Sequence, residues 1–245
     1  PAADIEIGEA PPERRVAALM ASQDAALARA EDAAEARLEG LRAVLRLTGL
    51  KIEDVLAEGG EDGEGGPFIP LSESLLVQDG AAAGDPFASR IARITARLTE
   101  SEALEDALRA APLGVPVNAP HRHTSPYGPR IDPFTRRPAF HAGKDFAAFR
   151  RAPIVASAPG RVVYAGWRAG YGRMVEIDHG YGFRTRYGHL HTIDVRRGDE
   201  VTAGQQLGGM GSTGRSTATH LHYEVWFNGN HYDPERFLRA GRYVH

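Results

Sequence analysis

The chain contains no cysteine among its 245 residues. This absence excludes disulfides, thiol nucleophiles, zinc fingers and iron–sulfur clusters. It does not fix the compartment, although it suits an oxidising one. The chain also lacks any run of about 18 apolar residues, so no membrane span is predicted, and no signal peptide is predicted either. Because it begins at Pro1 and not at Met, a trimmed export signal or membrane anchor remains open.

What the chain does contain is divided unevenly along its length. Apolar residues make up 42% and charged residues 25%, which favours a folded protein of one or two domains. Residues 1–112 hold 22 acidic against 11 basic residues, whereas residues 113–245 hold 10 against 18. All ten histidines lie in the second segment. We therefore expect two domains with different tasks, 1–112 and 113–245.

The first segment is expected to be helical. Pro11 and Gly49 bracket a stretch rich in Ala, Glu, Arg and Leu, and its apolar spacing predicts a helix of about 36 residues. A second helix is predicted over 86–111, with Asp85 as its N-cap. A glycine-rich acidic loop at 57–67 lies between them. The simplest arrangement is an antiparallel, coiled-coil-like hairpin.

The second segment is expected to be a β domain. Beyond residue 112 the apolar period changes from 3.6 to 2. Six short runs rich in β-forming residues are separated by glycine turns, at 153–158, 160–167, 173–179, 182–190, 205–210 and 219–227. No helical stretch lies between these runs, which favours antiparallel pairing over βαβ units. The fold class is therefore α+β by segment, with a helical hairpin followed by an antiparallel β domain.

Two histidine motifs indicate a metal site. His220 and His222 fall in an alternating strand, so their side chains share a face. A His-x-His pair is a weak signal alone, and paired structural histidines are the alternative. His141 and Asp145 flank Gly143, which favours a turn from which both side chains reach one point. A set of His, Asp and His suits Zn²⁺ and leaves a fourth tetrahedral position open for water. We therefore expect a catalytic metal.

Two other motifs lack the context that their chemistry requires. Residues 209–214 (GMGSTG) fit G-x-G-x-x-G, but a phosphate site needs a strand before the glycines and a helix after them. Here the glycines lead into the His220 strand, so nucleotide binding is not expected. His189, His191 and Asp194 do not have the spacing of a metallo-β-lactamase site.

Taken in order, these pieces resemble the LytM/lysostaphin-type zinc peptidases, which cleave peptidoglycan cross-bridges and stem peptides. The similarity covers about residues 113–240. Its motifs are Ser125-Pro-Tyr-Gly-Pro-Arg-Ile-Asp-Pro-Phe134, His141…Asp145, Ala158-Pro-Gly-Arg-Val-Val-Tyr-Ala-Gly166, Val175-Glu-Ile-Asp-His-Gly180, Tyr187-Gly-His-Leu190, Gly198…Val201…Gly204-Gln205 and His220-Leu-His222. The resemblance implies a compact antiparallel β domain with a central groove. The turn Phe149-Arg-Arg-Ala-Pro153 departs from the family's Gly-Thr-Pro.

The resemblance also implies roles for five residues. His141, Asp145 and His222 correspond to the zinc ligands, and His189 and His220 line the site. One of these two histidines acts as general base and the other stabilises the transition state, in either order. All five positions are intact, which favours an active enzyme over a degenerate relative.

The implied function is a zinc-dependent endopeptidase that hydrolyses peptide cross-links of peptidoglycan outside the cytoplasm, most simply in the periplasm. Zinc acidifies water and polarises a carbonyl, and a neutral imidazole can accept the proton. The positive β domain suits anionic stem peptides. The cleaved bond stays open between a D-Ala–diaminopimelate cross-link and a glycine bridge. The helical segment would position, dimerise or inhibit the enzyme. The alternative is a non-hydrolytic scaffold that binds wall peptide or a partner hydrolase. Neither reading involves nucleic acid.

Several further residues have two readings each. Glu224 either hydrogen-bonds a ligand imidazole or forms a strand salt bridge, and His191 either lines the groove or is simply solvated. His179 is expected to be structural. Three residues of the first motif could shape one wall of the groove: Tyr127, Arg130 and Asp132.

Overall fold

The computed structural model describes residues 11–59 and 86–244. These residues fall into two compact units, one formed by 11–41 with 86–102 and the other by 42–59 with 103–244. The second unit therefore contains the ends of the long helices as well as the β domain. No helix in the described ranges is both long enough and apolar enough to span a bilayer.

The helical segment has the two long helices that were predicted. Helix α1 spans Pro12–Thr48 and α4 spans Pro86–Ala110. Gly49 follows α1 at φ +82°, the left-handed conformation in which glycine ends helices. A short helix that was not predicted, α2 (Ile52–Glu58), takes the first residues of the expected 57–67 loop. Residues 60–67 of that loop and the Asp85 cap lie outside the described residues.

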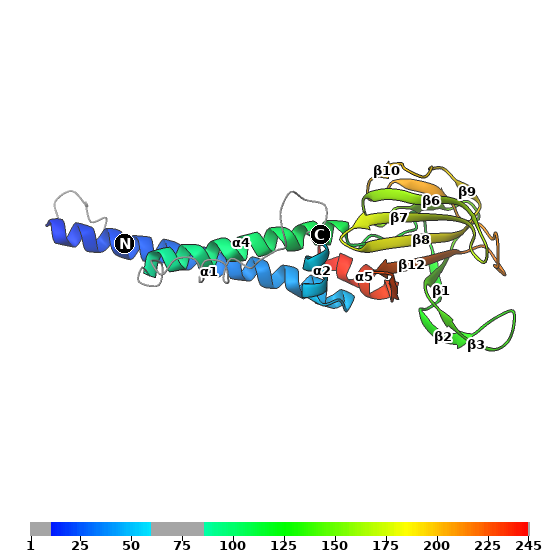
Figure 1. Cartoon of the computed structure of the whole chain (residues 1–245), viewed down its shortest axis with the longest axis horizontal. Helices are drawn as coiled ribbons and strands as arrows, with labels where there is room; N and C mark the ends of the chain where they lie inside the picture. The colour runs from blue at the N-terminus through cyan, green and yellow to red at the C-terminus, as the bar shows by residue number, and fades with distance from the viewer. Residues whose placement is uncertain (1–10, 60–85, 245) are drawn as a thin grey trace. The chain divides into compact units, whose positions relative to one another are not determined.

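Ion pairs in the first unit show the direction of the two helices relative to each other. Arg93 pairs with Glu31 at 3.1 Å and Arg97 pairs with Glu35 at 2.6 Å, so each pair is separated by 62 positions. A constant separation means that α1 and α4 run parallel, as Figure 1 also shows. The antiparallel prediction was wrong because neighbouring helices are expected to be antiparallel only when a short loop connects them. Helix α2 and residues 59–85 separate the two helices instead.

The β domain is built on antiparallel pairing throughout, as predicted (Figure 1). Its largest sheet has the order β1-β4-β12-β8-β7-β6-β10, with β13 paired to β12. A second sheet has the order β5-β11-β9, and β2 pairs with β3 alone. The strands are β1 (Arg122–Ser125), β2 (Gly128–Ile131), β3 (Pro138–His141), β4 (Lys144–Ala147), β5 (Pro153–Val155), β6 (Gly160–Arg168), β7 (Gly172–Gly180), β8 (Phe183–Leu190), β9 (Thr192–Ile193), β10 (Glu200–Val201), β11 (Gln206–Gly209), β12 (Leu221–Phe227) and β13 (Asn230–Tyr232).

The second unit encloses the ends of the helices in its own core. Leu45, Val55 and Leu104 are completely buried, as are Tyr187 and other side chains of the sheets. A hydrogen bond of 2.8 Å from the Asn228 amide to the Glu58 carboxylate ties α2 to the turn after β12. Burial of this apolar surface is the main term that holds such a unit together. The chain after β13 forms α5 (Pro234–Ala240) and a 3₁₀ turn, η2 (Gly241–Tyr243).

Candidate metal centre

The metal centre predicted from sequence is built on three strands. Asp145 on β4 and His222 on β12 are register partners in the large sheet. His141 ends β3, and the turn to β4 passes very close to β12. A Cβ at Gly143 would lie 2.5 Å from the Tyr223 carbonyl oxygen and 2.8 Å from His222 Cε1. Only glycine allows this approach, so Gly143 brings His141 against the β4–β12 pair.

Three side-chain atoms converge at this point. His141 Nε2 lies 3.1 Å from Asp145 Oδ1 and 3.0 Å from His222 Nδ1, and the last two atoms are 3.0 Å apart. His141 and Asp145 are buried, and His222 is half-buried. Within the described ranges, no other three His, Asp or Glu side chains form such a group. The structure thus brings together the three residues singled out as ligands, whose metal role stays a prediction.

The hydrogen-bond partners of the His141 and His222 rings show which ring nitrogens are free to bind a metal. His141 Nδ1 donates to the Pro126 carbonyl at 2.7 Å, and His222 Nε2 donates to a carboxylate oxygen of Glu224 at 2.8 Å. The opposite nitrogen of each neutral ring therefore carries a lone pair. Together with Asp145 Oδ1, three lone-pair atoms face one another, which is unfavourable without a cation between them. Two imidazoles and one carboxylate form the donor set of a catalytic zinc site, so the residues fit Zn²⁺.

The electrostatics of the group also favour a positive charge. Burial acts to raise the pKa of Asp145, but hydrogen bonds from His141 and His222 hold it well below its usual value. Burial acts to lower the pKa of His222, but hydrogen bonds to Asp145 and Glu224 raise it to about 9. In the absence of metal a proton supplies the cation, so metal binding would release protons.

Glu224 holds His222 in place from behind. Its carboxylate is 1% exposed and accepts hydrogen bonds from His222, from Tyr171 Oη at 2.8 Å and from Trp226 Nε1 at 2.7 Å. Arg186 Nη1 lies 3.5 Å away. Glu224 therefore makes both of the expected interactions, the hydrogen bond to the His222 ring and a salt bridge with Arg186. Burial would raise the pKa of Glu224, but these hydrogen bonds keep it below its usual value. Such partners fix the orientation and tautomer of a ligand imidazole.

Sequence reasoning missed the direct contact that Arg130 makes with the site. Arg130 Nη1 donates to Ser125 Oγ at 2.6 Å and lies 3.3 Å from Asp145 Oδ2. One carboxylate oxygen of Asp145 therefore faces the two histidines, and the other faces a guanidinium group. Tyr171, in the turn before β7, was missed as well. Neither contact has a signal in residue spacing, because Arg130 and Tyr171 reach side chains of other strands that only the fold brings beside them.

The two further histidines of the predicted site lie beside this group. His220 Nδ1 donates to the Ala218 carbonyl at 2.8 Å, and His189 Nδ1 donates to the Thr213 carbonyl at 2.8 Å. Both hydrogen bonds leave Nε2 as the free nitrogen, and His220 Nε2 lies 4.0 Å from Asp145 Oδ1. The two rings are 4.7 Å apart between centroids. Burial and the neighbouring His220 lower the pKa of His189 to about 4.

The glycine run 209–214 has a structural role in this arrangement. A Cβ at Gly211 would lie 2.8 Å from the His189 carbonyl oxygen and 2.5 Å from the His191 nitrogen. Gly211 also forms an isolated bridge with His220. The glycines thus let this loop pack against the end of β8 and support both histidines. His189 itself has φ +60°, an uncommon left-handed conformation that is often found at functional sites.

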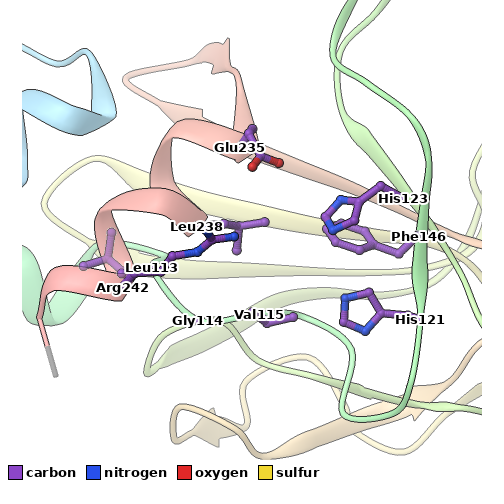
Figure 2. A pocket seen from close by; sticks show the side chains of 10 residues that line it. Leu113, Gly114, Val115, His121, His123, Phe146, Glu235, Leu238 and Arg242 are labelled. Carbon is purple, nitrogen blue, oxygen red and sulfur yellow. The ribbon is translucent and has the colours of Figure 1, made fainter.

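The remaining histidines do not join the centre. His179 is buried between the Pro159 carbonyl and Thr185, in agreement with a structural role. His191 lies at the surface against Arg150. His121 and His123 line a pocket of about 300 Å³ with Phe146 and α5 residues (Figure 2). Because successive residues of β4 point to opposite faces, this pocket is on the other side of the strand from the Asp145 carboxylate.

Comparison with known proteins agrees with this geometry. Residues 139–234 match the model of peptidase family M23. The DD-carboxypeptidase/endopeptidase Mpg of Neisseria meningitidis is 42% identical over 113 residues, which are 46% of this chain and 26% of that protein. The murein hydrolase activator NlpD of Escherichia coli is 40% identical over 112 residues, which are 45% of this chain and 29% of that protein. The chain thus spans less than a third of these curated relatives.

One solved structure is also similar to about half of the chain. The catalytic domain of the antimicrobial peptidase lysostaphin from Staphylococcus simulans is 35% identical, with a TM-score of 0.45. The similarity covers 49% of this chain and 92% of that domain. Residues 139–234, which match the family model, contain His141, Asp145, His189, His220 and His222. The chain belongs to peptidase family M23 through its β domain.

Proposed function

We propose that the chain is a zinc-dependent endopeptidase that hydrolyses peptide cross-links of peptidoglycan. The observation that carries this proposal is the convergence of His141 Nε2, Asp145 Oδ1 and His222 Nδ1 within 3.1 Å of one another. Each ring donates a hydrogen bond to an acceptor on its outer side, so the lone pair of its other nitrogen points inward. An M23 domain with an intact donor set is the expected basis of a metallopeptidase.

The residues around the three ligands supply the rest of the chemistry. Zinc bound there would polarise the scissile carbonyl and acidify a water molecule. His189 and His220 each keep Nδ1–H on a backbone carbonyl and so present Nε2 as a proton acceptor. One ring would take the proton from water and return it to the leaving amine, and the other, when protonated at Nε2, would donate a hydrogen bond to the reacting carbonyl oxygen. The 4.7 Å between the rings allows both to reach one peptide group.

The proposal extends to substrate and location. The Neisseria relative is named an endopeptidase, and the excess of basic residues beyond 112 suits peptides with free carboxylates. We propose an extracytoplasmic, periplasmic site of action. A D-Ala–diaminopimelate cross-link is the first candidate for the cleaved bond, and a glycine bridge is the second.

Mass spectrometry of cross-linked peptidoglycan tests the proposal. The full chain and its His222→Ala variant are each incubated with the purified polymer, with melting temperatures as a check on folding. We expect loss of cross-linked peptides with the wild type only, and the masses of the products identify the bond. Unchanged peptides with a zinc-loaded, folded wild type would contradict it.

The second candidate is a non-hydrolytic regulator, which the similarity to a murein hydrolase activator favours. Under this reading the β domain binds wall peptide or a partner hydrolase without cutting. The two functions separate in one experiment. A regulator would raise the activity of a purified partner hydrolase on peptidoglycan equally well as wild type and as His222→Ala, and it would release no products alone.

The helical segment is proposed to regulate the β domain. Its acidic excess and the basic excess of residues 113–245 are the observations behind this idea. Neutralising exposed acids of the first unit, such as Asp24→Asn, should then change the hydrolysis rate without changing zinc content. Unaltered rates in several such variants would contradict regulation by charge.

A further inference from the structure

Three arginines gather around His191, at the end of β8. Arg150 Nη2 lies 3.4 Å from His191 Nδ1, and Arg173 Nη1 donates to the His191 carbonyl at 3.0 Å. Arg151 follows Arg150 in the turn between β4 and β5. Desolvation together with the charges of all three arginines lowers the pKa of His191, so the three side chains act on the same ring. We call Arg150, Arg151 and Arg173 the arginine cluster.

Among the residues that the structure describes, no carboxylate neutralises the arginine cluster. Of the described residues, no carboxylate pairs with any of its three guanidinium groups, and all three arginines are exposed. Other arginines of the β domain are paired, such as Arg215 with Asp132 and Arg186 with Glu176. Like charges gathered in one place repel one another. Such a cluster is favourable when an anion occupies it, because guanidinium groups bind carboxylates with two parallel hydrogen bonds.

The backbone at Arg151 is held in a costly conformation. Arg151 has φ +67°, a left-handed conformation that glycine adopts most easily. It is fixed there by a hydrogen bond of 2.8 Å from its nitrogen to the Met210 carbonyl, within the tight turn closed by Ala152 and Phe149. Strained backbone of this kind gathers at functional sites. Arg151 thus places a long basic side chain at a position whose backbone conformation would suit glycine better.

The arginine cluster adjoins the metal centre through one loop. Thr213 accepts a hydrogen bond from His189 Nδ1 at its carbonyl and another from the Arg173 nitrogen at its Oγ1. In the same loop, a Cβ at Gly209 would lie 3.1 Å from Arg151 Cα. Residues 209–213 therefore touch His189 on one side and the arginine cluster on the other. An anion bound by the cluster would lie next to a peptide held at His189 and His220.

We propose that the arginine cluster is a subsite that binds a free carboxylate of the peptide substrate, close to the bond that is cut. This inference rests on the proposed function for the identity of its ligand. The His191 ring adds a donor, because Arg150 occupies Nδ1 and leaves Nε2–H free. Carboxylate peptides should be preferred over the same peptides with carboxamides, and salt should weaken the preference.

Binding measurements on paired peptides test the subsite apart from hydrolysis. The probes are a synthetic cross-linked stem-peptide dimer with free carboxylates and the same dimer with carboxamides. The full chain carrying His220→Ala serves as parent, so that the probes survive. We expect the parent to bind the carboxylate dimer about tenfold more tightly. Added Arg151→Gln and Arg173→Gln should abolish the preference, whereas Arg197→Gln, an exposed arginine of the β9–β10 connection, should retain it.

The possible outcomes distinguish failure of the subsite from failure of the proposed enzyme. Equal binding of the two dimers, no binding of either, or a preference that survives the double substitution overturns the subsite. Arginine-dependent capture by phosphatidylglycerol vesicles, with equal binding of both dimers, overturns it in favour of a membrane surface. Hydrolysis by the wild type without any carboxylate preference leaves the proposed enzyme intact and removes the subsite. An arginine-dependent preference without hydrolysis supports the subsite and removes the enzyme.

Discussion

His222 and Glu224 stand two residues apart on β12, and a hydrogen bond of 2.8 Å joins His222 Nε2 to Glu224 Oε1. Alternation along the strand puts both side chains on one face. The bond fixes the ring so that Nδ1 faces His141 and Asp145. A charged partner behind a ligand imidazole also makes the ring a better donor to a metal.

The first prediction concerns a variant in which the charge of Glu224 is removed. Glu224→Gln should lower the affinity for zinc by about 10–100-fold, because a neutral amide holds and polarises the His222 ring less well. Competition with a chromogenic zinc chelator measures the affinity. Glu200→Gln, an exposed carboxylate paired with Arg161, is the matched control and should change nothing. Equal affinities in all three proteins would mean that Glu224 does not tune the site.

The second prediction concerns acid stability. Burial lowers the pKa of His179 to about 4, although the Pro159 carbonyl and Asp178 act to raise it. The unfolded chain, with an ordinary histidine pKa of about 6.5, then binds more protons than the folded chain. The contribution of neutral, buried His179 to the free energy of unfolding is therefore fully present above pH 6.5 and falls as the pH drops toward 4. At pH 5 the loss from this group should be about 2 kcal/mol.

Urea unfolding at pH 7.5 and pH 5 checks this expectation. His179→Gln keeps an amide that can hydrogen-bond but does not titrate. Its loss of stability between the two pH values should be smaller than that of the wild type by about the same 2 kcal/mol. An identical pH dependence in both proteins would show that His179 does not carry the effect.

The third prediction concerns a buried hydroxyl. Tyr187 Oη accepts hydrogen bonds from the Ser157 backbone nitrogen at 3.0 Å and from Thr185 Oγ1 at 3.1 Å. Tyr187→Phe leaves a buried N–H without a partner, which should cost about 1–3 kcal/mol of unfolding free energy. Denaturant unfolding measures it, with the exposed Tyr243→Phe as control. A loss no larger than in the control would contradict the importance of this bond.

The fourth prediction tests whether the end of α4 belongs to the β domain. Leu104 is completely buried in the second unit, whereas Leu98 of the first unit is 37% exposed. Leu104→Ala should destabilise by about 2–5 kcal/mol and speed hydrogen exchange at the amides of β7. Leu98→Ala should leave β7 unchanged. If β7 protection survives Leu104→Ala, the helix end folds apart from the sheets.

Sequence reasoning worked where the local pattern and the tertiary structure agree. Strands β6, β7, β8, β11 and β12 were predicted within two or three residues, because each has alternating or β-branched residues between glycine turns. Strands β1 to β4 were missed. They are four residues long and several are mostly exposed, so their sequences contain no apolar alternation. The parallel course of α1 and α4 depends on pairs such as Arg97–Glu35, which no local signal specifies.

The candidate site shows the same contrast between residues with a local sequence pattern and residues whose contacts depend on the fold. His141, Asp145 and His222 could be proposed because their residue types and short spacings are typical of metal chemistry. Arg130 was predicted only as part of a groove wall, and Tyr171 and the arginine cluster were not predicted at all, because a single arginine or tyrosine has many possible partners. Their roles depend on which strands become neighbours, as when the turn before β7 places Tyr171 against Glu224.

The most direct test of the account is a zinc titration of hydrolysis by the metal-stripped chain on cross-linked stem peptides. We expect no hydrolysis without metal and full recovery near one zinc per chain. We also expect no recovery at any zinc level in His222→Ala, whose thermal melt should show a folded protein. Hydrolysis by the stripped chain, or recovery in the folded variant at the same zinc level as the wild type, would contradict it.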